Sequence, residues 1–197
     1  MRLFDLEKQF AFYEAYHSNP VNFLIHMVFV GPIFFTALIL FYFTPPLLNS
    51  TPIKLYEDSC FLGLNLGFLF TLIYALFYVC LDKKTGSLAA FLCLLYWISS
   101  SFVAHYLGFS LAWKVVLVAQ LFCWTGLVIG HGVFEKRAPA LLDNLAEAFL
   151  MEPFFVLLEA LRTFTGYEPY PGFHAKVKAT IDAEIKQWQE KKHKKMS

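Results

Sequence analysis

The sequence predicts an all-α integral membrane protein of about four transmembrane helices, with interfacial amphipathic helices near the N-terminus and the C-terminus. Hydrophobic residues make up 58% of the chain and the mean hydropathy is +0.54, well above an ordinary soluble domain. Four stretches also lack Asp, Glu, Lys and Arg over about 20 residues or more, the length that a helix needs to cross a bilayer. These stretches are residues 15–53, 59–81, 85–113 and 115–134.

Residues 1–17 are predicted to form a short amphipathic helix on the membrane surface, because apolar side chains recur at intervals of three and four. Those side chains are Leu3, Leu6, Phe10 and Tyr13. Asn19-Pro20 has the pattern of a cap residue followed by the first residue of a new helix. The first transmembrane helix is therefore expected from about Val21 to Phe43.

The next segments alternate between apolar runs and turns. Residues 44–58 are rich in proline and polar side chains and are expected to form a loop. The remaining spans are expected at about 59–81, 87–106 and 115–134, with the last two joined by a short Gly-Phe-Ser turn. All but Lys54 and Lys114 of the 16 lysines and arginines then lie on one side, so the positive-inside rule places both termini in the cytoplasm.

The chain is expected to divide into a membrane-embedded domain, residues 1–165, that carries any chemistry, and a basic cytoplasmic tail, residues 166–197. Charges interrupt the apolar positions beyond Asn144, so a pair of interfacial helices is expected there and not a fifth span. The tail has an amphipathic stripe and ends in Lys194-Lys195-Met196-Ser197, which resembles a dilysine retrieval signal. This ending predicts the endoplasmic-reticulum membrane.

Several functional classes are excluded by missing motifs. The four cysteines lie in or beside apolar runs and form no CxxC pair, so they are not expected to bind zinc or to form a disulfide. The sequence also contains no phosphate-binding glycine loop, no G-x-S-x-G motif and no nucleic-acid module. The first apolar run follows a polar lead without a cleavage pattern, so no removable signal peptide is expected.

Three histidines are predicted to meet at one depth on the cytoplasmic side. His17 precedes the first span, His26 lies about one and a half turns into it, and His131 lies near the end of the last span. Polar side chains inside a bilayer are costly and usually functional. The break at Asn19-Pro20 lets the first helix fold back, so that His17 and His26 can face each other. His105 is expected about 27 Å away and is not expected to be a ligand.

These histidines suggest a metal site. Glu135 follows His131 by four residues and shares its helix face, which suits either chelation or a simple hydrogen bond. Histidines with a carboxylate suit Fe²⁺, Mn²⁺ or Zn²⁺, and this combination is favoured in non-haem iron chemistry with O₂. The same histidines would equally suit helix capping or the binding of lipid headgroups. Lys136 and Arg137 would hold a fatty acid carboxylate or reach toward lipid headgroups.

Two sequence blocks resemble a known family. The pattern Tyr13-x3-His17-x4-Asn22-x3-His26, followed by Gly130-His131-x3-Glu135-x3-Pro139-Ala140 and Asn144, resembles the 2-hydroxy fatty acid dioxygenase family over most of residues 1–165. The resemblance implies a membrane enzyme of the endoplasmic reticulum that requires Fe²⁺. Such an enzyme uses O₂ to shorten a 2-hydroxy fatty acid by one carbon, a step in the breakdown of phytosphingosine to odd-chain acids. Leu127 departs from the family pattern, in which Gln often stands four residues before the second-block histidine.

The resemblance, taken with these histidines, implies that Fe²⁺ binds the 2-hydroxyl and carboxylate of the substrate together, and that oxidation at C2 breaks the C1–C2 bond. The acyl chain is expected between the first and last spans. The expected ligands are His17, His26, His131 and Glu135, the last either as a ligand or as support; the expected supporting residues are Tyr13, Asn22 and Asn144. Expected partners are membrane lipids and no nucleic acid. One alternative is a non-enzymatic membrane scaffold or headgroup-binding protein, and another is a di-iron lipid hydroxylase, which needs more clustered histidines.

Overall fold

Four helices begin where a short polar side chain accepts a hydrogen bond from a backbone N–H of the first turn. Asp5 accepts from Lys8, Asn19 from Val21, Asn65 from Phe68, and Asp82 from Thr85. In the computed structural model these caps open helices α1 Leu6–Tyr16, α2 Pro20–Tyr42, α3 Leu66–Leu81 and α4 Lys83–Ile129. The structure describes residues 4–47, 53–56, 59–136, 138, 145 and 147–183.

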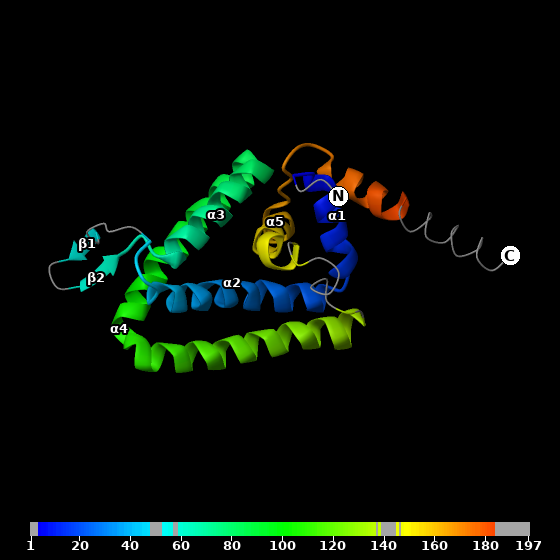
Figure 1. Ribbon diagram of the computed structural model, residues 1–197. Coiled ribbons are helices and arrows are strands. Elements are labelled where there is room, and N and C mark those ends of the chain that lie inside the picture. Colours follow the sequence, from blue (N-terminus) through cyan, green and yellow to red (C-terminus); the bar gives the residue numbers. More distant parts are fainter. Residues whose placement is uncertain are drawn as a thin grey trace.

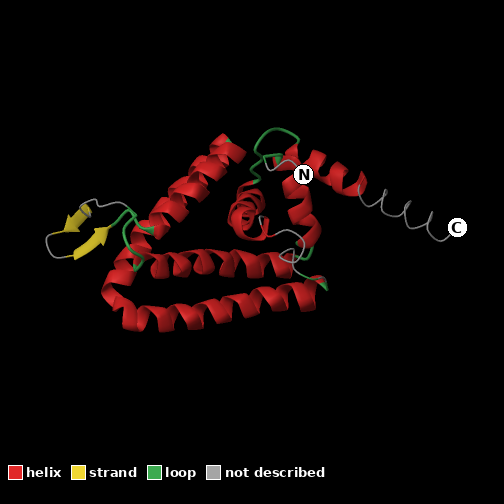
Figure 2. Cartoon of the chain, viewed as in Figure 1, coloured by secondary structure: helices red, strands yellow, loops and turns green. Residues whose placement is uncertain are grey.

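Shorter elements complete the described part of the chain. Strands β1 Ile53–Tyr56 and β2 Ser59–Leu62 pair antiparallel, with Ile53 opposite Leu62, and form the hairpin drawn in yellow in Figure 2. The π-helix η1 Gly130–Glu135 continues α4, and the π-helix η3 Glu147–Met151 leads into α5 Glu152–Thr165. Residues 173–183 are also helical.

α4 consists of two helical arms, residues 83–107 and 109–129, that meet at a sharp kink at Gly108. Gly108 has φ 65° and ψ 159°, values that suit glycine because it lacks a Cβ atom. The first arm of α4 lies along α3, and the second arm returns beside α2 (Figure 1). The break between the two arms therefore falls at Gly108, the first residue of the expected Gly-Phe-Ser turn, and the chain is helical again directly after this glycine.

The helix predicted as the first span is confirmed as a helix, whereas the second predicted span is wrong at its start and agrees with α3 at its end, Leu81. α3 begins at Leu66 because Asn65 caps it, and Ser59–Leu62 belongs to the hairpin, where part of a helix was expected. Pro20–Tyr42 and the stretch Lys83–Glu135 are long and apolar enough to cross a membrane. The 16 residues of α3 are apolar but fewer than the usual 20. The count of four spans stays a prediction.

The main core lies on the side of α2 where α1, α3 and α5 meet (Figure 1). Its largest fully buried side chains include Phe10 and Tyr13 of α1 and Phe154 and Phe155 of α5. Helix 173–183 joins this core through Phe173 and Val177, and the rings of Phe10 and Phe173 lie 5.5 Å apart. The apolar face of α1 therefore packs against protein, and its predicted interfacial position stays a prediction.

Candidate metal centre

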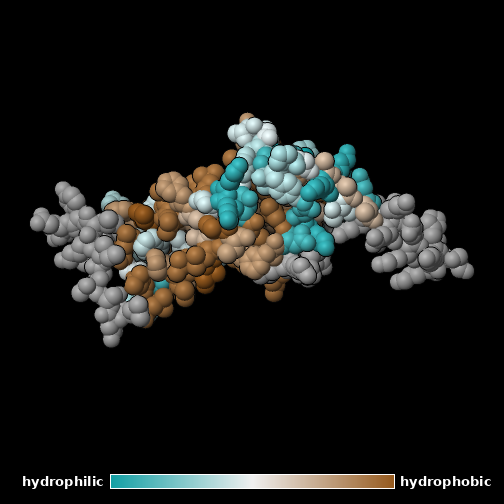
Figure 3. All heavy atoms as spheres, turned by 90° about the horizontal axis from the view of Figure 1, so that it is seen from above, coloured by the Kyte–Doolittle hydropathy of each residue, from teal (hydrophilic) through white to brown (hydrophobic). Residues whose placement is uncertain are grey.

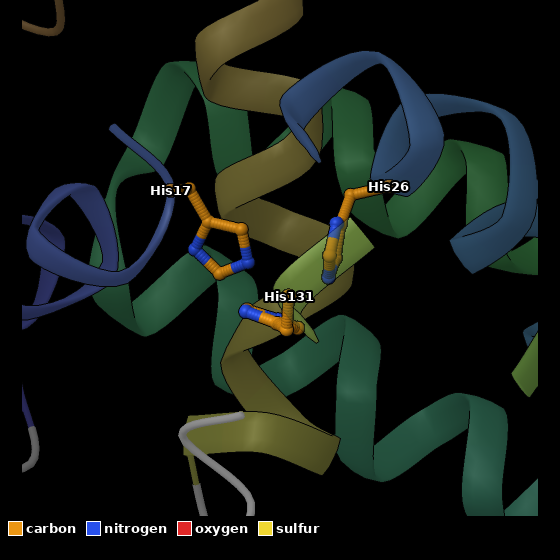
Figure 4. A group of neighbouring side chains, drawn as sticks. All are labelled: His17, His26 and His131. Atoms are coloured by element: carbon orange, nitrogen blue, oxygen red, sulfur yellow. The ribbon is translucent and has the colours of Figure 1, made fainter. Parts of the chain in front are cut away.

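The structure brings His17, His26 and His131 together from three different elements. Their ring centroids lie 4.4 Å apart for His17 and His26, 5.0 Å for His17 and His131, and 4.9 Å for His26 and His131. One candidate ligand atom from each ring lies within 4.8 Å of the other two. Figure 4 shows the three rings pointing toward a common point.

Backbone carbonyls fix which nitrogen of two of these rings faces the centre. Nδ1 of His17 lies 2.9 Å from the carbonyl oxygen of Tyr13, and Nδ1 of His26 lies 2.9 Å from that of Asn22. A carbonyl only accepts, so each Nδ1 carries the proton and each Nε2 of the neutral ring keeps its lone pair. Asn22 therefore contacts the His26 ring through its carbonyl and not through its side chain.

Burial keeps His17 in the neutral form that binds metals. The Tyr13 ring stacks on the His17 ring, with centroids 4.2 Å apart and planes 23° apart. Burial holds the pKa of His17 well below its usual value, and the neighbouring His26 lowers that pKa further. The His17 imidazole is therefore neutral at physiological pH, and its lone pair is available.

Two glycines allow the end of α4 to approach α2 closely. A Cβ atom at Gly126 would lie 2.3 Å from the Phe29 ring, and one at Gly130 would lie 2.4 Å from Oδ1 of Asn22. Small residues four apart are a common device for close helix packing in membranes. The approach at Gly130 sets the position of His131, which follows it on the π-helix η1 and is buried.

Glu135 connects the end of η1 to the turn that carries His17. One carboxylate oxygen accepts from the backbone N–H of Ser18 at 3.0 Å and from its hydroxyl at 2.5 Å. The other accepts from the N–H of Asn19 at 2.9 Å and from the side chain of Asn22 at 3.3 Å. Of the two roles predicted for Glu135, ligand or support, this geometry favours support.

Glu152 is a neighbour of the histidines that the sequence reasoning missed. Its Oε1 atom lies 3.4 Å from Nε2 of His17 and 3.7 Å from Nε2 of His26. One signal could have pointed to it: Glu152 is an acidic residue directly before Pro153 in an otherwise apolar stretch, and a charge in apolar surroundings is often functional. Nothing in the local spacing related it to the histidine blocks.

Other predicted site residues lie elsewhere or outside the described residues. Lys136 ends η1 in a left-handed conformation with φ 54°, and its side chain is exposed, so its contact with a substrate carboxylate stays a prediction. Arg137 and Asn144 fall outside the described residues. Nδ1 of His105 lies 3.3 Å from the Tyr42 hydroxyl oxygen. Tyr42 follows His26 by sixteen residues on α2, so His105 contacts this helix about 24 Å from His26.

A cavity of about 550 Å³ begins at the histidines and continues between α2 and the second arm of α4. Its walls are mostly apolar, and Leu127 is one of the lining residues. Gln120 also lines it, but its side chain is engaged with Ile33, Thr36 and Trp124. Along α2 the lining residues are His26, Val30, Ile33, Phe34, Ala37, Leu40 and Phe41. The cavity therefore has a polar end with the histidines and a long apolar remainder.

Comparison with known proteins identifies the family. The family described as 2-hydroxy-palmitic acid dioxygenase Mpo1-like matches residues 3–164. The chain belongs to this family. It is also 34% identical over 187 residues to the 2-hydroxy-palmitic acid dioxygenase MPO1 of Saccharomyces cerevisiae (strain ATCC 204508 / S288c), which covers 94% of this chain and 93% of that protein. No solved structure matches the chain. The family resemblance predicted from the two histidine blocks is confirmed.

Proposed function

We propose that this chain is an Fe²⁺-dependent dioxygenase that α-oxidises 2-hydroxy fatty acids with O₂ and shortens them by one carbon. The central observation is that three buried or half-buried imidazoles converge at one end of a long apolar cavity. Membership of the Mpo1-like family supports the dioxygenase reaction and the 2-hydroxy acid substrate. The place of the reaction in phytosphingosine breakdown is part of the same proposal.

The donor set fits a ferrous ion. Neutral imidazoles are good ligands for Fe²⁺, and His17 and His26 present bare Nε2 atoms because their Nδ1 atoms are held by carbonyls. His17, His26 and His131 would hold the ion. When bound, Fe²⁺ supplies the reaction with O₂ that amino-acid side chains lack, and it polarises the hydroxyl and carboxylate of the substrate.

The protein contributes binding and orientation. The cavity follows α2 from His26 to Phe41, fifteen residues or about 22 Å, which suits a long acyl chain. Burial of the chain in these apolar walls contributes about 0.8 kcal/mol for each CH₂ group. An acyl chain held along the cavity would present its polar head, with C1 and C2, to the histidines. Fixed orientation of this kind is a large part of catalytic power.

We also propose that the chain lies in the endoplasmic-reticulum membrane with both termini in the cytoplasm and about four spans. Large apolar side chains are exposed along α2 and α4, among them Val28 at 61%, Val118 at 69% and Phe122 at 66%. Figure 3 shows hydrophobic residues over the middle of the molecule and hydrophilic ones gathered toward the end that carries α1. Exposed apolar patches of this extent fit a lipid environment. Membrane lipids would then be direct neighbours of α2 and α4.

Single substitution of each histidine tests the proposal. We expect His17→Ala, His26→Ala and His131→Ala each to lower product formation from a 2-hydroxy fatty acid by at least 100-fold, because each removes one ligand. Product shortened by one carbon and bound iron are measured on purified protein, and accumulation is checked by immunoblot. His105→Ala is the control and should keep full activity.

The same measurements separate the enzyme from a scaffold. About one iron per chain in the wild type, lost in the three variants, supports the dioxygenase. Full activity in any of the three variants removes that histidine from the scheme. A wild-type chain without iron or product favours a packing role for the histidines.

A further inference from the structure

Glu152 brings a carboxylate to the three histidines from a part of the chain that lies outside both histidine blocks. Its Oε1 atom lies 3.4 Å from Nε2 of His17 and 3.7 Å from Nε2 of His26. These Nε2 atoms are the ones with free lone pairs, because both Nδ1 atoms donate to backbone carbonyls. The carboxylate oxygen therefore faces the same point as the histidine ligand atoms.

This arrangement favours a cation. A carboxylate oxygen and two unprotonated imidazole nitrogens are all acceptors, and acceptors that face one another repel. Nitrogen and oxygen ligands lie about 2.1 Å from a metal ion, so two neighbouring donors on one ion are about 3.0 to 3.5 Å apart. The two measured distances from Glu152 are at or slightly above this spacing.

The charge of a divalent ion is a second reason to expect Glu152 among its ligands. Three neutral imidazoles leave a divalent ion with its full charge, which is costly beside an apolar cavity unless an anion pairs with it. Glu135 is engaged elsewhere, since both of its oxygens accept hydrogen bonds from the turn at Ser18 and Asn19. Glu152 lines the cavity together with the three histidines, and 13% of its side chain is exposed.

The core holds Glu152 in place. Its neighbours Met151 and Phe154 are 1% and 0% exposed, and the Tyr74 hydroxyl donates to the carbonyl of Phe149 at 2.6 Å. Glu152 also lies inside a continuous helical stretch, because the π-helix η3 ends at Met151 and α5 begins at the next residue. A ligand on such a rigid support keeps its position without a large entropy cost.

We propose that Glu152 is a fourth protein ligand of the ion held by His17, His26 and His131. This inference rests on the proposed function, because it takes a divalent ion at the histidines as given. It makes the centre a site of three histidines and one carboxylate.

Cobalt binding to the full chain in detergent micelles tests the proposal, because Co²⁺ absorbs visible light in a way that reports its ligands. Glu152→Gln keeps the shape of the side chain and removes its charge. We expect its Co²⁺ affinity to fall on the order of 100-fold. Removal of a residue that only supports a ligand typically lowers metal affinity by about 10- to 100-fold, and loss of a ligand should cost at least as much. The absorption spectrum at saturation should also change. Glu135→Gln is the matched control and should keep the wild-type spectrum at saturation, even where its affinity is lower.

Folding is measured separately on the metal-free proteins. Metal-free Glu152→Gln should show one cooperative melting transition, as the wild type does, so that a change in Co²⁺ binding reflects the ligands and not a loss of folding. Glu152→Asp retains the charge on a shorter side chain and should bind Co²⁺ with an affinity between those of the wild type and Glu152→Gln. An unchanged spectrum in Glu152→Gln overturns the ligand role of Glu152, whether or not the affinity falls. A wild-type chain that binds no Co²⁺ overturns the metal centre, and with it the proposed function.

Discussion

Glu135 gives the most quantitative prediction, because all four of its hydrogen bonds are defined. One oxygen accepts both bonds from Ser18, and the other accepts from Asn19 and Asn22. In Glu135→Gln an NH₂ group replaces one of these oxygens. The two groups that donated hydrogen bonds to that oxygen then face another donor and lose their acceptor. A buried donor without an acceptor costs about 1–3 kcal/mol. Ser18 is exposed and Asn19 half-buried, so water replaces part of each bond and the lower end applies.

Two such donors together cost about 2 kcal/mol, which corresponds to an affinity loss of about 30-fold if the whole cost falls on the metal-bound state. Glu135 ties the turn after His17 to the end of η1, so its loss frees His17 relative to His131. Titration of the metal-free protein in micelles with Co²⁺ measures the change. Glu168→Gln is a matched control, because Glu168 also accepts from a backbone N–H, that of Gly172, in an exposed turn. Affinity in Glu135→Gln within threefold of the wild type would refute the positioning role.

Two further substitutions test the helix contact and the cavity. Gly130→Ala places a Cβ atom 2.4 Å from Asn22, so thermal melting should show a loss of about 1–3 kcal/mol, whereas Gly132→Ala, with nothing within 4 Å, should not. Ala37→Phe narrows the cavity about 16 Å beyond His26, so competition assays should show long-chain substrates lost before short ones. Val28→Phe, at an exposed position, is the control and should not change the chain-length preference. Equal loss of activity at all chain lengths in Ala37→Phe, or the same change of preference in Val28→Phe, would contradict the placement of the acyl chain in the cavity.

Local features of the chain predicted much of the fold. The cap at Asn19-Pro20 correctly placed the start of the first long helix, because such caps act over a few residues. The glycine at position 108 correctly marked the turn between two helical segments. The start of α3 was predicted too early, because the length of an apolar run does not reveal that its first residues pair with a strand.

The sequence predicted some residues of the candidate site and missed others. The histidine blocks could be recognised because each pattern lies within one short segment. Glu152 and the walls of the cavity could not, because they depend on how α5 and the second arm of α4 pack against α2. His26 and Glu152 are more than 120 residues apart in the sequence, and the spacing of nearby residues does not predict that two such distant residues lie close together.

The sequence by itself determined the helical character of the chain, its apolar composition and the identity of three metal-binding candidates, since these follow from residue chemistry and short-range periodicity. Only the tertiary structure decided that the three imidazoles converge, that Glu135 holds the turn beside them, and that Glu152 faces their lone pairs. The physical reason is that such contacts arise from the packing of distant helices. That packing depends on the close approach at Gly126 and Gly130, which is a property of two surfaces and not of one segment.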